Sequence, residues 1–151
     1  MFLLLCFWLL AGCTTPSVEP DHAENALIRF FYLLNQGDYQ SADTYYGGDY
    51  QTLINMNPAV NPSDHALLWE NACHNNGFMC LQVSRATFLE LRGSIYAFEV
   101  EFMQADGTPF SRGACCGEDP SSVLPQKSFL YGVVETEKGE FLVLDLPIYI
   151  P

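Results

Sequence analysis

Basic residues are scarce in this chain. Six lysines and arginines stand against eighteen aspartates and glutamates, and the formal net charge is −12 at pH 7. Because phosphate recognition needs clusters of lysine and arginine, this balance argues against a nucleic-acid partner. The same charge disfavours direct attachment to anionic lipid head groups. No apolar run in the sequence approaches the roughly 20 residues that a bilayer-spanning helix needs.

Recognisable catalytic and metal-binding motifs are also missing from the sequence. It contains no Gly-x-Ser-x-Gly elbow, no Cys-x-x-Cys spacing and no internal repeat. Aromatic residues, however, make up 14% of the chain. Because that content can supply a packed core, we expect one ordered domain rather than a disordered chain. We predict no cofactor and no metal.

The N-terminus carries a short apolar run that ends in small residues and a cysteine. Residues 2–10 have the length of a secretory signal core, which is about 7–15 residues. Leu10-Ala11-Gly12-Cys13 resembles the lipobox of bacterial lipoproteins, in which the cysteine thiol takes a diacylglycerol and becomes the mature N-terminus. The resemblance implies a signal peptide over 1–12, a lipid on Cys13 and a location on the extracytoplasmic face of a bacterial membrane. The alternative is a buried N-terminal strand with an incidental cysteine.

The residues after the anchor predict a tether and then three helices. Residues 13–20 are polar and carry two prolines, as in an extended linker. Asp21 is the expected cap of a first helix that Gly37 closes. The apolar residues at helical spacing between them are Ala23, Leu27, Phe30, Phe31 and Leu34. A second helix is expected from Asp38 to Tyr46, and a third is expected to open at Asn61-Pro62 and end at Gly77.

From Cys80 onward the apolar pattern has a period of two residues, which is typical of strands. Tyr96, Phe98, Val100 and Phe102 alternate with more polar residues, as in a strand with one buried face. Further strands are expected over 81–91, 129–136 and 141–146, and turns at 92–94, 106–107 and 138–139. The prediction is an α+β domain over 21–151, with three N-terminal helices packed on a curved antiparallel sheet.

Two segments carry a resemblance to a known superfamily. Residues 26–31 (Ala-Leu-Ile-Arg-Phe-Phe) and 35–42 (Asn-Gln-Gly-Asp-Tyr-Gln-Ser-Ala) are similar to the opening of nuclear transport factor 2-like, or cystatin-like cone, domains. The order of the C-terminal strands agrees, so the resemblance covers about residues 22–149. It implies a cone-shaped pocket, which Trp69, Phe98 and Phe102 would line. The superfamily includes ketosteroid isomerase-like enzymes, dehydratases and non-enzymatic binding domains, so the fold does not fix the function.

Four cysteines remain after the leader and Cys13 are set aside: Cys73, Cys80, Cys115 and Cys116. An even number in an exported domain predicts disulfide bonds. The expected hairpins place 73–80 and 115–116 at the same sheet end, which favours bridges between these two regions. The alternative is a local Cys73–Cys80 bond with a vicinal pair at 115–116. A zinc site is disfavoured, because adjacent cysteines rarely both reach one metal.

The resemblance to isomerase-like members of the superfamily implies a candidate catalytic site in this chain. Asp145 shares a strand face with Phe141 and Val143, and it could act as a base with the phenol of Tyr39, Tyr45 or Tyr46. The alternative is that Asp145 pairs with Arg85, Arg92 or Lys127, or faces water.

The sequence is therefore compatible with three functions. The first is a non-enzymatic envelope lipoprotein, held at the membrane by its lipid, that binds a small apolar ligand or a partner protein in or beside the pocket. The second is a small lyase or isomerase that uses Asp145 and a tyrosine. The third is a structural accessory of an envelope complex. A filled interior with an exposed apolar surface outside it would favour a protein partner.

Overall fold

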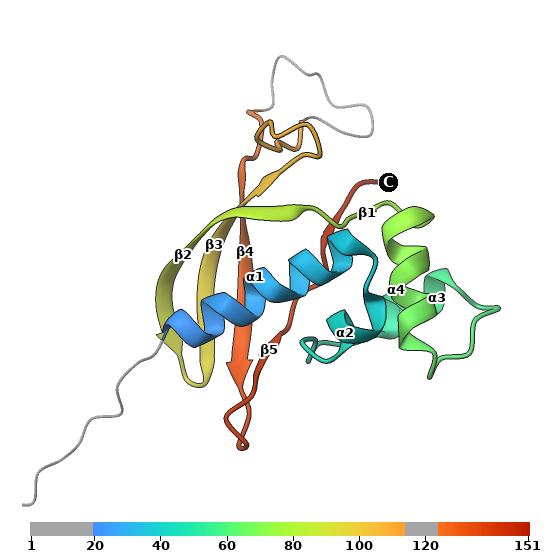
Figure 1. Cartoon of the computed structure of the whole chain (residues 1–151), viewed down its shortest axis with the longest axis horizontal. Coiled ribbons are helices and arrows are strands. Elements are labelled where there is room, and N and C mark those ends of the chain that lie inside the picture. The colour runs from blue at the N-terminus through green and yellow to red at the C-terminus, as the bar shows by residue number, and fades with distance from the viewer. Residues whose placement is uncertain (1–19, 114–123) are drawn as a thin grey trace, which may run out of the picture.

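The computed structural model describes residues 20–113 and 124–151. The leader, Cys13, most of the tether, Cys115 and Cys116 lie outside the described residues. The described chain is an α+β domain, with helices first and antiparallel strands after them. In Figure 1 the long helix α1 (Pro20–Gln36) crosses one face of a curved sheet, and the shorter helices gather beside its C-terminal end. Within these residues, no helix has the length and apolarity needed to cross a bilayer.

Helix α1 forms as the apolar spacing predicts. Its buried residues are Ala23, Ala26, Leu27, Phe30, Phe31, Leu33 and Leu34, which all face the sheet or the other helices. The helix begins at Pro20, one residue before the expected cap, so Asp21 lies in its first turn. It ends before Gly37, whose φ of 75° belongs to the left-handed region that glycine adopts without strain.

The number of helices differs from the prediction, because the structure has four where three were expected. Helix α2 (Tyr39–Asp43) begins as expected after Asp38, whose side chain accepts a hydrogen bond from the amide of Ser41 at 3.2 Å. It is only five residues long, so Tyr45 and Tyr46 lie beyond it rather than on it. Tyr46 instead forms a bridge with Val143 in the last strand of the sheet.

The other difference concerns the chain between 50 and 74. Helix α3 (Gln51–Met56) was not predicted, because it has six residues, no side-chain cap and a single buried residue, Leu53. Helix α4 (His65–His74) begins three residues later than the expected opening at Pro62, because Asp64 caps it. The shift places Leu68 in the core and leaves Leu67 38% exposed.

The main sheet has four antiparallel strands in the order β2-β3-β4-β5. These strands are β2 (Gln82–Arg92), β3 (Ile95–Met103), β4 (Ser128–Glu135) and β5 (Phe141–Val143). A small second sheet pairs β1 (Phe78–Met79) with β6 (Ile148–Tyr149). The predicted alternation in β3 is confirmed, because Tyr96, Phe98, Val100 and Phe102 are buried beneath the helices.

An aromatic core joins α1 to the sheet. The ring of Phe31 lies 4.9 Å from that of Phe102 and 5.1 Å from that of Tyr131, both edge to face. On the other side of α1, Phe30 packs edge to face on Trp69 of α4 at 5.5 Å. Each such pair stabilises the fold by about 0.5–1.5 kcal/mol beyond the contribution of the apolar area that it buries. Because these contacts join α1 to both the sheet and α4, the domain has one continuous core.

The disulfide in the described chain is local, so the favoured cross-link between 73–80 and 115–116 is wrong for Cys73 and Cys80. Cys73 at the end of α4 is bonded to Cys80, and their Cα atoms are 5.5 Å apart. The reason is the turn at Gly77, where a φ of 80° reverses the chain and returns Cys80 to the helix end. A Cβ at this glycine would lie 2.3 Å from the carbonyl oxygen of Ile150, so the turn also depends on a missing side chain.

Candidate functional site

The space between the helices and the sheet is filled by side chains. The three residues that the cone resemblance implies as a pocket lining are part of this packing. Trp69 and Phe98 are 0% exposed and Phe102 is 1% exposed. Phe98 contacts Phe88 across the sheet, while Trp69 contacts Phe30, Tyr46 and Tyr50. These three side chains therefore leave the implied pocket lining packed rather than open in the described part of the chain.

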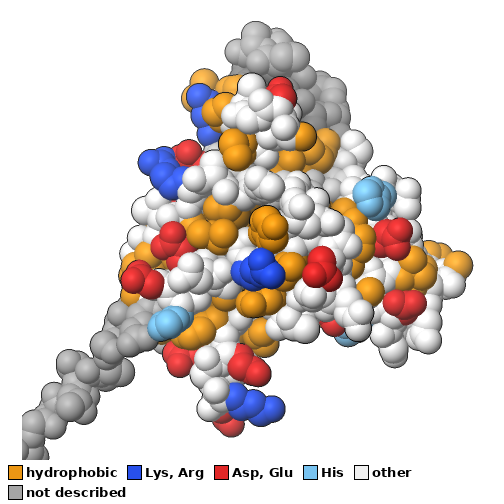
Figure 2. Space-filling model, viewed as in Figure 1, with side chains coloured by type: hydrophobic (Ala, Val, Ile, Leu, Met, Phe, Trp, Pro, Cys, Tyr) orange, Lys and Arg blue, Asp and Glu red, His pale blue; other side chains and the backbone are white. Residues whose placement is uncertain are grey.

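An open groove of about 850 Å³ lies on the outside, between α1, the segment after α2, and the β4–β5 hairpin. Its lining combines exposed apolar and aromatic side chains with polar ones. The lining includes Ile28, Arg29, Tyr32, Tyr45, Phe141 and Leu142. Figure 2 shows hydrophobic side chains around a Lys or Arg side chain on the face of the molecule that α1 crosses. The volume is within the range of about 300–1,000 Å³ that is common for ligand sites.

Two aromatic residues of the groove, Tyr32 and Phe141, have rings that contact a basic side chain or a histidine. Tyr32 is 44% exposed although it belongs to a helix that buries seven apolar side chains. The guanidinium of Arg29 lies 5.2 Å from the centroid of the Tyr32 ring, within range of a cation–π interaction. At the N-terminal end of the groove, the ring of Phe141 stacks on His22 at 6.0 Å. The groove thus offers apolar walls and one cation.

Asp145, the candidate base, lies elsewhere. It is exposed, and its Oδ2 accepts a hydrogen bond from the backbone amide of Gly132 at 2.6 Å. It borders a smaller hollow of about 290 Å³ on the outward side of the sheet, with Leu89, Ile95 and Leu130. Two of the three basic residues considered as its partners pair with other carboxylates, since Arg85 pairs with Glu101 and Arg92 with Glu90.

Of the three candidate phenols, Tyr46 lies near enough to the Asp145 carboxylate for that charge to raise its pKa, whereas Tyr39 and Tyr45 have other surroundings. Tyr39 hydrogen-bonds His74 at 2.9 Å between the phenol oxygen and Nε2, and Tyr45 lines the groove described above. The hydroxyl of Tyr46 donates to the carbonyl oxygen of Asp49 at 3.1 Å. Burial raises the pKa of Tyr46 far above its ordinary value, and the charge of Asp145 adds to the rise. Because the Tyr46 hydroxyl already donates its proton to the Asp49 carbonyl oxygen, it is poorly placed to donate to an oxyanion.

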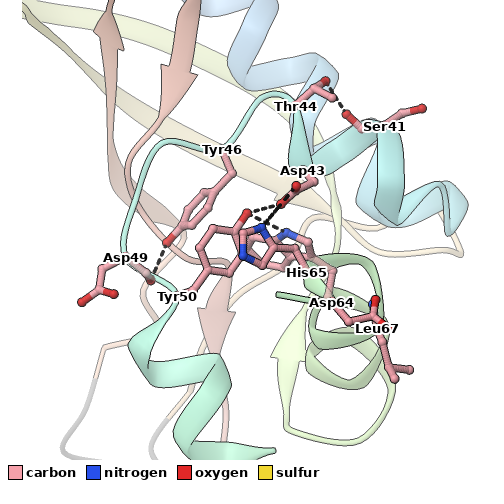
Figure 3. A network of polar contacts seen from close by, with 10 residues as sticks. Ser41, Asp43, Thr44, Tyr46, Asp49, Tyr50, Asp64, His65 and Leu67 are labelled. Carbon is pink, nitrogen blue, oxygen red and sulfur yellow. Dashed lines mark hydrogen bonds and ion pairs between the residues drawn. The ribbon is translucent and has the colours of Figure 1, made fainter. Parts of the chain in front are cut away.

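A polar network that the sequence did not reveal joins the three short helices (Figure 3). The Tyr50 hydroxyl donates to Asp43, and Trp69 Nε1 donates to the Tyr50 oxygen at 3.4 Å. His65 Nδ1 lies 3.2 Å from a carboxylate oxygen of Asp43, and its ring stacks on Tyr50 at 3.8 Å. Asp43 lies on α2, Tyr50 just before α3, and His65 and Trp69 one turn apart on α4, so the network depends on contacts between three separate segments.

This network resembles the carboxylate–histidine part of a hydrolytic site, but it has no nucleophile. Among the described residues, no serine hydroxyl or thiol hydrogen-bonds His65. In the same part of the chain, no group of three or more histidine, cysteine or acidic side chains could hold a metal ion. The contacts of the network join α4 to α2 and to the segment at Tyr50.

The outward face of the sheet is a second accessible apolar surface in the described part of the chain. Leu130 is 72% exposed, Leu89 48% and Ile95 37%. The pairing of Ile95 with Val134 and of Glu99 with Leu130 places them on the face opposite to the buried aromatic residues. Apolar surfaces of this kind can mark a protein contact.

The sequence matches no protein-family model, and no curated protein matches it.

Proposed function

We propose that this chain is an exported, lipid-anchored binding domain that uses the groove between α1 and β5 to hold part of a partner protein at the cell envelope. The observation that carries the proposal is the contrast between the filled interior and this outer groove of about 850 Å³. Aromatic side chains occupy the space where an enclosed ligand would bind, whereas Tyr32 and Tyr45 line a surface that is open to solvent.

We further propose that the domain is a filled relative of the nuclear transport factor 2-like cone. Three features support this relation: the helices precede the strands, α1 crosses the helix-facing side of the sheet, and the sheet is a strongly curved antiparallel one (Figure 1). On this proposal the domain extends over residues 21–151, and residues 1–12 and 13–20 are the leader and the tether.

The lipid anchor gives a direct prediction for Cys13. The Cys13→Ser variant of the full chain is expected to lack the diacylglyceryl group and to retain residues 1–12, because the modified thiol is required for processing. Intact mass spectrometry of the protein from bacterial membranes measures both changes. Cys6→Ser is the matched control, since Cys6 lies in the segment to be removed. An unmodified wild-type chain that retains its first twelve residues would rule out the anchor.

Site-specific cross-linking tests the binding function. With p-benzoylphenylalanine in place of Ile28, which lines the groove and is 37% exposed, we expect a discrete adduct with one envelope protein in the native host. The purified partner should reproduce the adduct, and Tyr45→Ala should reduce it several-fold because it removes one wall of the groove. Met56 is the control position, since it is 36% exposed on α3 and outside the groove.

The third function, an accessory of an envelope complex, is favoured by the exposed leucines on the outward sheet face. The same experiment with the cross-linker at Leu130 separates the two proposals. An adduct from Leu130 but not from Ile28 would indicate that the partner binds to the outward face of the sheet and not to the groove. Adducts from neither position would contradict a binding function of either kind.

A further inference from the structure

Arg29 is an exposed cation that the fold leaves available. Three other arginines in the described chain have polar partners: Arg85 pairs with Glu101, Arg92 with Glu90, and Arg112 donates to Gln126 at 2.6 Å. Arg29 has neither an ion pair nor a hydrogen bond among the described residues, and its guanidinium lies over the Tyr32 ring. Stacking restricts the guanidinium plane, and its N–H donors match the two oxygens of a carboxylate.

The backbone of β5 supplies a second recognition element in the same groove. The amide of Val143 donates to the Tyr45 carbonyl oxygen at 2.8 Å, and the Val143 carbonyl accepts from the amide of Gly47 at 2.9 Å. In an antiparallel strand, residues two positions apart direct their backbone groups to the same side. The N–H and C=O of Phe141 therefore also point away from β4, toward the groove, where no described backbone group pairs with them.

We infer that the groove binds an extended peptide segment that carries a carboxylate, with the carboxylate on Arg29 and the peptide backbone paired to Phe141. This inference rests on the proposed function and names the chemistry of the partner. Apolar side chains of the peptide would contact Tyr32 and Tyr45, which form the walls of the groove. The mode is strand addition, in which backbone hydrogen bonds give affinity and side-chain contacts give specificity.

The dimensions and charges of the groove favour this occupant. His22 and Arg29 both line it and are seven residues apart on α1, so they are separated by about two turns, or about 10 Å. An extended peptide covers that distance with about three residues. Glu140 also lines the groove, and it directly precedes Phe141, whose ring stacks on His22. The negative charge of Glu140 therefore lies at the His22 end of the groove, opposite to Arg29. A peptide carboxylate is therefore repelled at the hairpin end and attracted at the Arg29 end.

Three defined peptides test the inference on the full lipidated chain in detergent. They are acetyl-Thr-Val-Phe-Val with a free C-terminus, acetyl-Thr-Val-Phe-Glu-amide, and the neutral acetyl-Thr-Val-Phe-Gln-amide. We expect the two acidic peptides to bind about tenfold more tightly than the neutral one, because a bidentate pair with arginine is a strong contact. Whichever acidic peptide binds more tightly identifies a terminal or a side-chain carboxylate as the natural group. Calorimetric titration gives the Kd values.

The Arg29→Gln variant should weaken both acidic peptides about tenfold and leave the neutral peptide unchanged. Arg85→Gln is the matched control, since Arg85 is an exposed arginine paired with Glu101 on β3 and should leave every Kd unchanged. Strand addition also predicts slower hydrogen exchange of the Phe141 amide in the complex. Equal Kd values for acidic and neutral peptides, or an Arg29→Gln variant that binds as wild type does, would overturn the inference.

The two proposals can fail separately. If Ile28 still cross-links a partner while Arg29→Gln has no effect, the groove is a binding site but the carboxylate chemistry is wrong. If the acidic peptides bind through Arg29 while Ile28 gives no adduct, the groove chemistry is right and the proposed envelope partner is wrong.

Discussion

Phe31→Ala is expected to lower the free energy of unfolding by about 3–5 kcal/mol, the usual cost of removing a fully buried phenylalanine ring. Phe31 is 0% exposed and packs edge to face on Phe102 and Tyr131, so its ring joins α1 to two neighbouring strands. Alanine would leave a cavity between the helix and the sheet. Because a domain has only about 5–15 kcal/mol of stability, the change would consume a large part of it.

Urea denaturation followed by far-ultraviolet circular dichroism measures the loss. Tyr32→Ala is the matched control, since the neighbouring side chain is 44% exposed on the groove side of the same helix. That substitution should cost less than about 1 kcal/mol, because it removes an aromatic ring from a surface and not from a core. Equal losses for the two variants would mean that α1 does not pack on the sheet through Phe31.

Raising the pH from 8 to 11 is expected to destabilise the domain by roughly 3 kcal/mol through two buried tyrosines alone. Tyr46 and Tyr131 are 7% and 4% exposed. Burial raises the pKa of both phenols well above the ordinary value of about 10, and the charge of Asp145 adds to the rise. Burial followed by the hydrogen bond to Asp43 raises the pKa of Tyr50 in the same direction.

The direction follows from proton linkage. A phenol whose pKa is raised by folding keeps its proton in the folded state, while the same phenol ionises in the unfolded chain above about pH 10. The unfolded state then binds fewer protons, so stability is complete below pH 10 and falls as the pH rises toward the folded pKa. Each phenol contributes between about 1 and 2 kcal/mol by pH 11.

Denaturation curves at pH 8 and pH 11, with tyrosinate absorbance at 295 nm, measure this effect. Tyr131→Phe should remove about half of the pH-dependent loss, because phenylalanine has no proton to release. Tyr149→Phe is the matched control at a position that is 42% exposed. A wild-type domain equally stable at both pH values would contradict the burial of these phenols.

The groove could have been found in part from the sequence. Helical periodicity assigns Leu27, Phe30, Phe31 and Leu34 to the buried side of α1, which leaves Ile28 and Tyr32 on the outer side beside Arg29. Two large apolar residues on the outer side of a helix are a signal of a binding surface. The other wall could not be found, because Tyr45 and Phe141 are nearly a hundred residues apart and meet only through the bridge between Tyr46 and Val143.

The sequence by itself determined the elements whose signals are local. The apolar spacing of α1, the strict alternation in β3 and the caps and turns at Asp38, Gly93 and Gly107 each depend on residues close along the chain. These features set the α+β class, since a period of 3.6 residues gives way to a period of two after Cys80.

Only the tertiary structure decided which distant side chains meet. It bonded Cys73 to Cys80 through the reversal at Gly77, filled the helix-facing side of the sheet with rings, and joined Asp43, His65 and Trp69 through Tyr50. The physical reason is that local propensities fix each segment within a few residues. Contacts across forty or a hundred residues depend on how the assembled helices and strands exclude water together.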